Sequence, residues 1–211
     1  RFNEPETLKM ARLGRELRAK GIDVIDLSLG EPDFDTPLHI KDAAIKAIRD
    51  NWSHYTPVAG LLDLREAVCT KLKRDNGLEY KAENIVVSTG AKQSLANALL
   101  ALVDEGDEVI IPTPYWVTYS ELVKIARGKV VEVKSNAEQG FKISPQQLEA
   151  AITNRSKVFL FSSPCNPSGA VYSREELAGL AEVFMKHSSI YIISDEIYEY
   201  INFASPPSSA E

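Results

Sequence analysis

Short runs of β-branched and aromatic residues alternate with longer amphipathic stretches from residue 85 onward. The short runs have the length of buried strands, and the stretches between them are long enough to cross to a parallel neighbour. The predicted strands are 85–87, 108–111, 129–133, 158–161 and 190–193, and the predicted helices between them are 91–103, 116–126, 145–152 and 174–186. We therefore expect a three-layer α/β fold, a mostly parallel sheet with helices on both faces.

The chain before residue 85 follows a different pattern. Apolar positions at helical intervals predict helices over 5–20, 37–49 and 62–76, and residues 22–29 form a short predicted strand. Gly30 then opens a Gly-Glu-Pro-Asp break. Because the segment before this break lies outside the alternation, we expect residues 1–30 to be a piece of a smaller domain and residues 31–211 to form an incomplete large domain.

The composition narrows the classes of partner. The net charge is −6 and the sequence pI is about 5.3, whereas a nucleic-acid-binding domain normally carries a basic face, so no nucleic-acid partner is expected. No apolar run approaches the roughly 18 residues of a membrane span, so no membrane partner is expected. Cys69 and Cys165 are far apart and the histidines are dispersed. We expect free thiols, no metal site and a cytoplasmic location.

Residues that directly follow the predicted strands are the candidates for ligand binding, because ligands of parallel sheets bind beyond the carboxyl ends of the strands. Gly90, Ala91 and Lys92 follow the first of these strands and open a helix. Small residues and free backbone amides at a helix start suit a phosphate. A tight turn capped by Ser88 or Thr89 is the alternative.

Two further loops present a ring and an amide. Trp116 follows a strand and two prolines that stiffen the turn, so it could stack on a flat heteroaromatic ligand or pack at a helix start. Asn166 lies in a loop between two prolines that restrict its backbone. A rigidly held amide suits hydrogen bonding to a ligand oxygen, and an Asx turn is the alternative.

Asp195 ends the last predicted strand, and Tyr198 follows three positions later. A carboxylate at the end of a buried strand is costly unless a cation or strong donors compensate its desolvation. The compensating group is either a lysine or arginine of the chain or a cationic ligand. Tyr198 is close enough to line the same pocket.

These strand ends together offer a phosphate site, a stacking ring, an amide, a buried carboxylate and a phenol. Pyridoxal 5'-phosphate uses all of them, because it is a planar pyridine with a phosphate, a phenolic oxygen and a ring nitrogen. An acidic partner keeps that nitrogen protonated, and the pyridinium then accepts the electron pair of an amino acid that loses its α-proton.

Six segments resemble the fold-type I pyridoxal-phosphate enzymes, specifically the bacterial type of the aspartate aminotransferase-like subgroup. They are GEPDFDTP from Gly30, HYTPVAGLLDLREAV from His54, STGAKQSL from Ser88, PTPYWVTY from Pro112, SSPCNPSGAVYS from Ser162 and ISDEIYEY from Ile193. Their order and spacing match across nearly the whole chain. The resemblance implies the N-terminal portion of such an enzyme, with residues 31–211 as the cofactor-binding domain.

The resemblance also implies roles for individual residues. Gly90, Ala91 and Lys92 would bind the cofactor phosphate, and Trp116 would stack on the ring. Asn166 and Tyr198 would hydrogen-bond the phenolic oxygen, while Asp195 would pair with the ring nitrogen. Tyr55 would reach the phosphate in the partner subunit of a homodimer. The implied substrate contacts are Gly30, Trp116 and Asn166, and Lys92 hints at a dicarboxylic substrate.

One departure from the family concerns the catalytic lysine. In the family a Schiff-base lysine follows this aspartate, and arginines further on bind the substrate carboxylate, but residues 196–211 contain neither. We expect no catalytic residue in the chain as given, no transamination by it alone and weak cofactor binding. For the intact enzyme the resemblance implies transamination between an amino acid, aspartate-like or broad, and a 2-oxo acid. A C–S lyase, an aminocyclopropane-carboxylate-forming relative and a non-catalytic binding domain remain alternatives.

Overall fold

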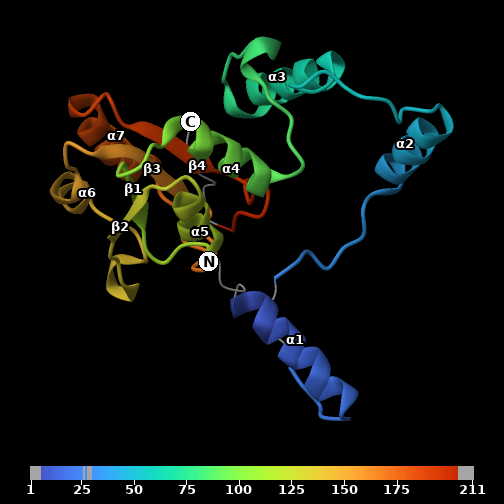
Figure 1. Cartoon of the computed structure of the whole chain (residues 1–211), viewed down its shortest axis with the longest axis horizontal. Helices are drawn as coiled ribbons and strands as arrows, with labels where there is room; N and C mark the ends of the chain where they lie inside the picture. The colour runs from blue at the N-terminus through green and yellow to red at the C-terminus, as the bar shows by residue number, and fades with distance from the viewer. Residues whose placement is uncertain (1–5, 26, 28–29, 204–211) are drawn as a thin grey trace. The chain divides into compact units, whose positions relative to one another are not determined.

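The computed structural model describes residues 6–25, 27 and 30–203. The chain divides into two units, Arg1–Pro57 and Val58–Glu211. The N-terminal unit contains α1 (Glu6–Ala19) and α2 (Leu38–Arg49), which confirms the first two predicted helices (Figure 1). Gly21 follows α1 with a φ of +78°, a backbone conformation in which glycine commonly ends a helix.

The strand predicted over residues 22–29 is not formed where the structure describes it. Residues 22–25 and 27 lie outside any strand, and the other residues of that prediction lie outside the described part. A strand requires a neighbour to pair its backbone, and the described residues of the N-terminal unit include no second strand. The domain boundary at residue 30 stays a prediction.

The C-terminal unit contains the alternating elements that the hydrophobic pattern predicts. In chain order they are α3 (Leu62–Asn76), η1 (Ala82–Asn84), α4 (Ala91–Leu102), β1 (Glu108–Pro112), α5 (Thr118–Ile125), β2 (Lys129–Val133), η2 (Ala137–Gln139), α6 (Pro145–Ala151), β3 (Ser156–Ser162), α7 (Arg174–Lys186) and β4 (Tyr191–Asp195). Helix α7 has the predicted bounds, with Ser173 as its N-cap and Glu176 completing a capping box.

The four strands form one parallel sheet in the order β2-β1-β3-β4. The strand predicted over 85–87 is wrong, because these residues lie outside the sheet. Val87 donates one backbone hydrogen bond to Ala59, 3.0 Å away, but no strand among the described residues pairs with the segment. Its β-branched residues satisfy the pattern of a strand without having a neighbour.

Alternate residues of the central strands point to opposite faces of the sheet, and each face packs against its own pair of helices. Val109 and Ile111 of β1 belong to a buried cluster with residues of α4 and α5. Ile110 and Phe159 belong to a second cluster with residues of α6 and α7. The strand period of two therefore divides one short sequence between two cores. This arrangement confirms the predicted three layers.

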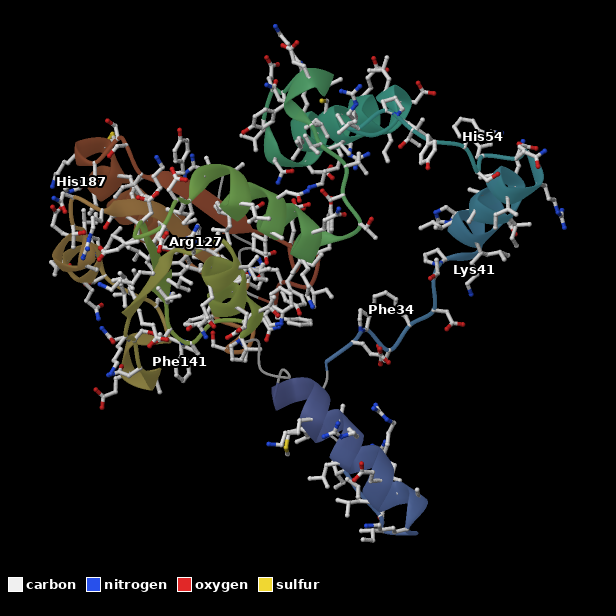
Figure 2. The ribbon with its side chains drawn as sticks, in the orientation of Figure 1. Phe34, Lys41, His54, Arg127, Phe141 and His187 are labelled. Atoms are coloured by element: carbon white, nitrogen blue, oxygen red, sulfur yellow. The ribbon has the colours of Figure 1, made fainter. Side chains whose placement is uncertain are left out.

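Polar contacts hold the elements at the periphery of this unit. Glu108, at the start of β1, is 2% exposed and accepts hydrogen bonds from Thr153 at 2.6 Å, Lys129 at 3.0 Å and Arg155 at 3.2 Å. His187, labelled in Figure 2, follows α7 and lies 2.7 Å from a carboxylate oxygen of Glu149 in α6. The Glu108 contacts join the amino ends of β1, β2 and β3. The carboxyl ends of the strands lie at the opposite edge of the sheet, where ligands of parallel sheets bind.

The described part of the chain contains neither a membrane-spanning helix nor a metal-binding cluster. None of its helices has both the length and the apolar character needed to cross a membrane. Within the same residues, no three side chains of His, Cys, Asp or Glu gather in a way that could hold a metal ion.

Candidate functional site

The carboxyl ends of β1, β3 and β4 open onto one cavity of about 130 Å³. Its lining combines residues of four segments that are far apart in sequence: Ala91, Trp116, Tyr119, Ser162, Asn166, Asp195, Ile197 and Tyr198. The cavity therefore brings together five of the residues predicted to bind the cofactor. Parallel pairing accounts for Trp116, Asn166, Asp195 and Tyr198, because it places the end of every strand at the same edge of the sheet, whereas Ala91 reaches the cavity from the start of α4.

Asp195 is the buried acid of this cavity. It ends β4 opposite Ser162 of β3 and is 8% exposed. One carboxylate oxygen accepts a hydrogen bond from the hydroxyl of Tyr119 at 2.7 Å, and the other accepts one from the backbone N–H of Ile197 at 3.2 Å. No lysine or arginine among the described residues forms an ion pair with it. The first alternative, a salt bridge within the chain, is therefore excluded for this part of the protein.

Tyr119 was not among the predicted site residues. It is 1% exposed, and burial together with the hydrogen bond to Asp195 raises the pKa of its phenol. The phenol therefore stays protonated and donates to the carboxylate. A signal for it was present in the sequence, because Tyr119 follows Trp116 by three positions at a helix start, and residues so spaced share a face. Only the fold shows that this face meets Asp195.

Trp116 lies beside the cavity with one neighbour at its edge and one over its ring. The indole meets the Tyr119 ring edge-on, with centroids 5.7 Å apart and an interplanar angle of 84°. The ammonium of Lys92 lies 5.0 Å from the centroid of the indole. The helix predicted from residue 116 begins at Thr118, so Trp116 belongs to the loop before α5. Its ring is thus held by side chains of α4 and α5 and not by the helix backbone.

The start of α4 presents backbone amides and no capping side chain. Gly90 is the N-cap, with φ +89° and ψ 163°, and no side-chain oxygen caps this helix. The alternative of a turn capped by Ser88 or Thr89 is therefore not observed. The first-turn amides of Ala91 and Lys92 have no acceptor within the helix, and such amides suit an anion. A Cβ at position 90 would meet nothing within 4 Å, so lack of space does not explain the glycine. The explanation is its φ of +89°, which residues with a side chain rarely adopt.

Asn166 and Tyr198 carry the polar groups of the cavity that remain available to a ligand. Neither side chain has a hydrogen-bond partner among the described residues, so the Asx-turn alternative for Asn166 is not observed. The loop of Asn166 is closed instead by backbone bonds between Cys165 and Ala170 at 2.9 Å and between Gly169 and Cys165 at 2.7 Å. Asn166 and Tyr198 also line a more open cavity of about 560 Å³.

Two predicted residues lie elsewhere in the chain. Gly30 and Tyr55 belong to the N-terminal unit, and their roles toward substrate and cofactor stay predictions. Ser162 and Ile197, which sequence reasoning missed, line the cavity beside Asp195. Ile197 donates its backbone N–H to Asp195. Every residue except proline has such a group, so the identity of a side chain does not predict this contact.

Two curated proteins similar to this chain are aminotransferases. The aspartate/prephenate aminotransferase of Cereibacter sphaeroides is 51% identical over 203 residues, which are 96% of this chain and 51% of the relative. The aspartate aminotransferase of Bacillus subtilis is 49% identical over 197 residues, 93% of this chain and 50% of the relative. The chain thus spans about half the length of the curated relatives it matches.

Solved structures agree with the sequence relatives. The aspartate aminotransferase from Rhizobium meliloti has a TM-score of 0.94 and 43% identity, covering 99% of this chain and 52% of the other. The Thermus thermophilus aspartate aminotransferase with maleate has the same TM-score and identity, covering 99% and 54%. The family model described as aminotransferase class I and II matches residues 22–210. That family depends on pyridoxal phosphate, which confirms the cofactor inferred from the strand ends. Because the match extends over most of its length, the chain belongs to the class I and II aminotransferase family.

Proposed function

We propose that the protein containing this chain is a pyridoxal-phosphate-dependent aminotransferase that exchanges an amino group between an amino acid and a 2-oxo acid. The observation that carries the proposal is the state of Asp195, a buried carboxylate that faces a cavity without an ion-pair partner among the described residues. A protonated pyridine nitrogen is the cation that such a carboxylate would stabilise. The relatives named aspartate aminotransferase support the reaction class.

The residues present fit the cofactor in several independent ways. Asp195 has donors on both oxygens, yet neither donor carries a charge. The polar groups of Asn166 and Tyr198, which have no hydrogen-bond partner within the described residues, lie in the same cavity, where a phenolic oxygen would accept from both. The larger of the two cavities that share these side chains has a volume of about 560 Å³, which is within the roughly 300–1,000 Å³ of ligand pockets. The free amides after Gly90 suit a phosphate.

Each residue then has a defined task. When bound, the cofactor supplies a pyridinium ring that takes up the electron pair released at the substrate α-carbon. Asp195 holds the proton on the ring nitrogen, and Tyr119 holds the carboxylate in one orientation by donating to it at 2.7 Å. Trp116 would cover one face of the ring and exclude water from it. Asn166 and Tyr198 donate to the phenolic oxygen.

Several parts of the proposal rest on the resemblance alone. Tyr55 is proposed to reach the phosphate of a partner subunit in a homodimer, and Gly30, Trp116 and Asn166 to contact substrate. The proposed substrates are aspartate or a broader set of amino acids with 2-oxo acids, in a cytoplasmic enzyme of amino-acid biosynthesis. The ammonium of Lys92 supports a dicarboxylic substrate, because it offers a positive charge 5.0 Å from the ring centroid of Trp116, which lines the cavity.

The test is an amino-group exchange assay on the complete reading frame that contains this chain, purified with pyridoxal phosphate. Aspartate with 2-oxoglutarate is assayed first, and a panel of amino acids follows. We expect formation of glutamate and oxaloacetate. Bound cofactor without exchange for any pair would overturn the proposal, and release of pyruvate and ammonia in place of a new amino acid would indicate a lyase.

A further inference from the structure

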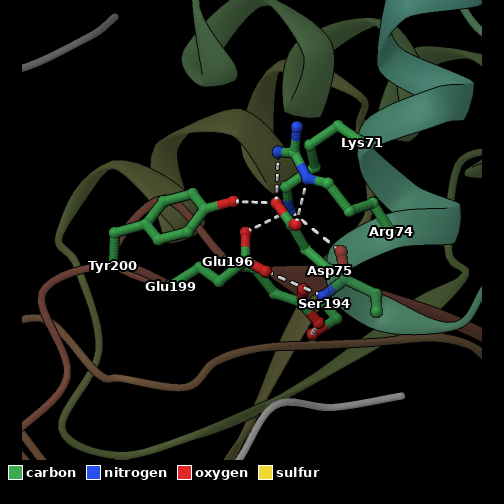
Figure 3. A network of polar contacts seen from close by, with 8 residues as sticks. Lys71, Arg74, Asp75, Ser194, Glu196, Glu199 and Tyr200 are labelled. Carbon is green, nitrogen blue, oxygen red and sulfur yellow. Dashed lines mark hydrogen bonds and ion pairs between the residues drawn. The ribbon is translucent and has the colours of Figure 1, made fainter.

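A cluster of polar contacts joins the end of α3 to the turn that follows β4 (Figure 3). We call it the α3 clamp and define it as Lys71, Asp75 and Asn76 of the helix with Glu199 and Tyr200 of the turn. Its two sides are more than 120 residues apart in sequence. The clamp lies outside the cavity, and none of its residues lines that cavity.

The inner half of the clamp is a closed ring of three side chains. The amide N–H of Asn76 donates to one oxygen of Glu199 at 2.7 Å, and the ammonium of Lys71 donates to the other oxygen. Lys71 also donates to the amide oxygen of Asn76 at 2.9 Å. Asn76 is 5% exposed, and the side chains of Glu199 and Lys71 are 20% and 29% exposed. Burial lowers the pKa of Lys71, but the bond to Glu199 and its charge outweigh that effect and raise it.

The outer half of the clamp fixes the next residue of the turn. The hydroxyl of Tyr200 donates to Asp75 at 2.6 Å, and Arg74 holds the same carboxylate with two bonds of 2.5 and 2.8 Å. The ammonium of Lys71 lies 5.2 Å from the centroid of the Tyr200 ring. Tyr200 is 73% exposed, so these contacts contribute less to stability than the inner ring does.

Along the chain, Tyr198 lies between Asp195 and the clamp residue Glu199. Its hydroxyl has no hydrogen-bond partner among the described residues, so no hydrogen bond from that part of the chain orients the phenol in the cavity. Its place depends on the backbone of the turn, which is closed by a bond from Glu199 to Glu196 of 2.9 Å and one from Ile201 to Tyr198 of 2.8 Å. This turn is fixed by Asp195 at one end and by the α3 clamp at the other.

The charged groups of the clamp are better suited to fixing the position of Glu199 than to stabilising the fold. Desolvating a carboxylate and an ammonium offsets much of their attraction, so an apolar contact would hold α3 against the turn at least as well. Charge-assisted bonds to both oxygens of one carboxylate, however, fix its position in two directions. Glu199 is adjacent to Tyr198, so a change in its position moves the phenol.

We propose that Lys71, Asn76 and Glu199 are positioning residues that aim the hydroxyl of Tyr198 at the phenolic oxygen of the cofactor. The inference rests on the proposed function, since it concerns the cofactor of that site. It adds a connection from α3 to the site that neither the motifs nor the cavity lining contains.

The test is a double-mutant cycle on the protein encoded by the complete reading frame that contains this chain, with pyridoxal phosphate as the ligand. Glu199→Gln keeps the size of the side chain but replaces one acceptor by a donor, so either Lys71 or Asn76 faces a donor. Tyr198→Phe removes the hydroxyl and keeps the ring. The dissociation constant is measured by titration, and the absorption band of bound cofactor reports the ionisation of its phenolic oxygen. The matched control is Glu79→Gln, because Glu79 follows the same helix and forms an exposed 2.7 Å ion pair with Lys73 in its last turn.

We expect Tyr198→Phe to weaken cofactor binding about threefold to tenfold, the loss of one hydrogen bond. Glu199→Gln should give a loss of similar size and shift the absorption band in the same direction, with no further loss when the two changes are combined. Glu79→Gln should leave both readouts unchanged. If Glu199→Gln does not fold, Lys71→Met, which keeps an unbranched stem without the charge, takes its place in the cycle.

The possible failures can be told apart. No binding of pyridoxal phosphate by the unsubstituted complete protein would overturn the proposed function and the positioning role with it. Binding in which the losses from Glu199→Gln and Tyr198→Phe add would overturn the positioning role alone, because a purely structural clamp acts independently of the phenol. An unchanged absorption band in Glu199→Gln would lead to the same conclusion.

Discussion

Tyr119→Phe tests the hydrogen bond on which the proposed site depends. The substitution removes the hydroxyl that donates to Asp195 at 2.7 Å and keeps a ring that is 1% exposed and packed against α4 and the sheet. A hydrogen bond to a charged group contributes about 1.5–3 kcal/mol. Asp195 keeps one donor, the backbone N–H of Ile197, so the carboxylate does not lose all compensation. We expect the free energy of unfolding to fall by about 1.5–3 kcal/mol, which lowers Tm by roughly 3–12 °C.

The pH dependence gives a second readout with a definite sign. Burial and the bond to Asp195 raise the pKa of Tyr119 above its usual value near 10. A group whose pKa is raised by folding contributes stability that is fully present below the unfolded value and is lost as the pH rises above it. The loss is about 1.4 kcal/mol for each pH unit above ~10. The unsubstituted chain should therefore lose stability more steeply than Tyr119→Phe at alkaline pH.

Thermal melts between pH 8 and pH 11 on both proteins measure these two effects. Tyr115→Phe is the matched control, because the Tyr115 ring stacks near Tyr119 and its hydroxyl donates to Glu132 at 2.7 Å on the exposed side of the unit. That control should cost less than about 1 kcal/mol. Equal costs for the two variants, together with parallel alkaline profiles for Tyr119→Phe and the unsubstituted chain, would refute the buried bond.

The remaining predictions concern the strand starts, the helix start and the isolated chain. Glu108→Gln should lower the free energy of unfolding by about 1–3 kcal/mol in denaturant titrations. The bond from Thr153 lowers the pKa of Glu108, so its contribution is present above ~4.5 and lost as the pH falls, and the acid profile of the variant should be flatter. Gly90→Ala should destabilise by about 1–3 kcal/mol and weaken cofactor binding, because φ +89° is strained for alanine; an unchanged melt would contradict this. The 211-residue chain should bind pyridoxal phosphate reversibly and not transaminate, and cofactor retained through dialysis would contradict the first part.

The strands and helices of the C-terminal unit could be predicted from periodicity because their local pattern and their environment agree. Helix α7 carries its own cap and apolar face, and β3 is a run of residues that suits burial on both sides. Residues 85–87 have the same local pattern and form no strand, because pairing depends on a neighbour that the pattern does not describe. The same reason explains the strand predicted over 22–29.

The sequence by itself determined which side chains follow the strands, and therefore that Trp116, Asn166 and Asp195 would meet at one edge of a parallel sheet. It left open whether Asp195 is neutralised by a cation of the chain. Only the tertiary structure decided this, by placing the phenol of Tyr119 against a carboxylate 76 residues away and no lysine or arginine of the described residues beside it. The physical reason is that the residues at the carboxyl end of a strand follow from local pattern and chain direction, whereas the partner of a buried charge depends on how a helix packs across the sheet.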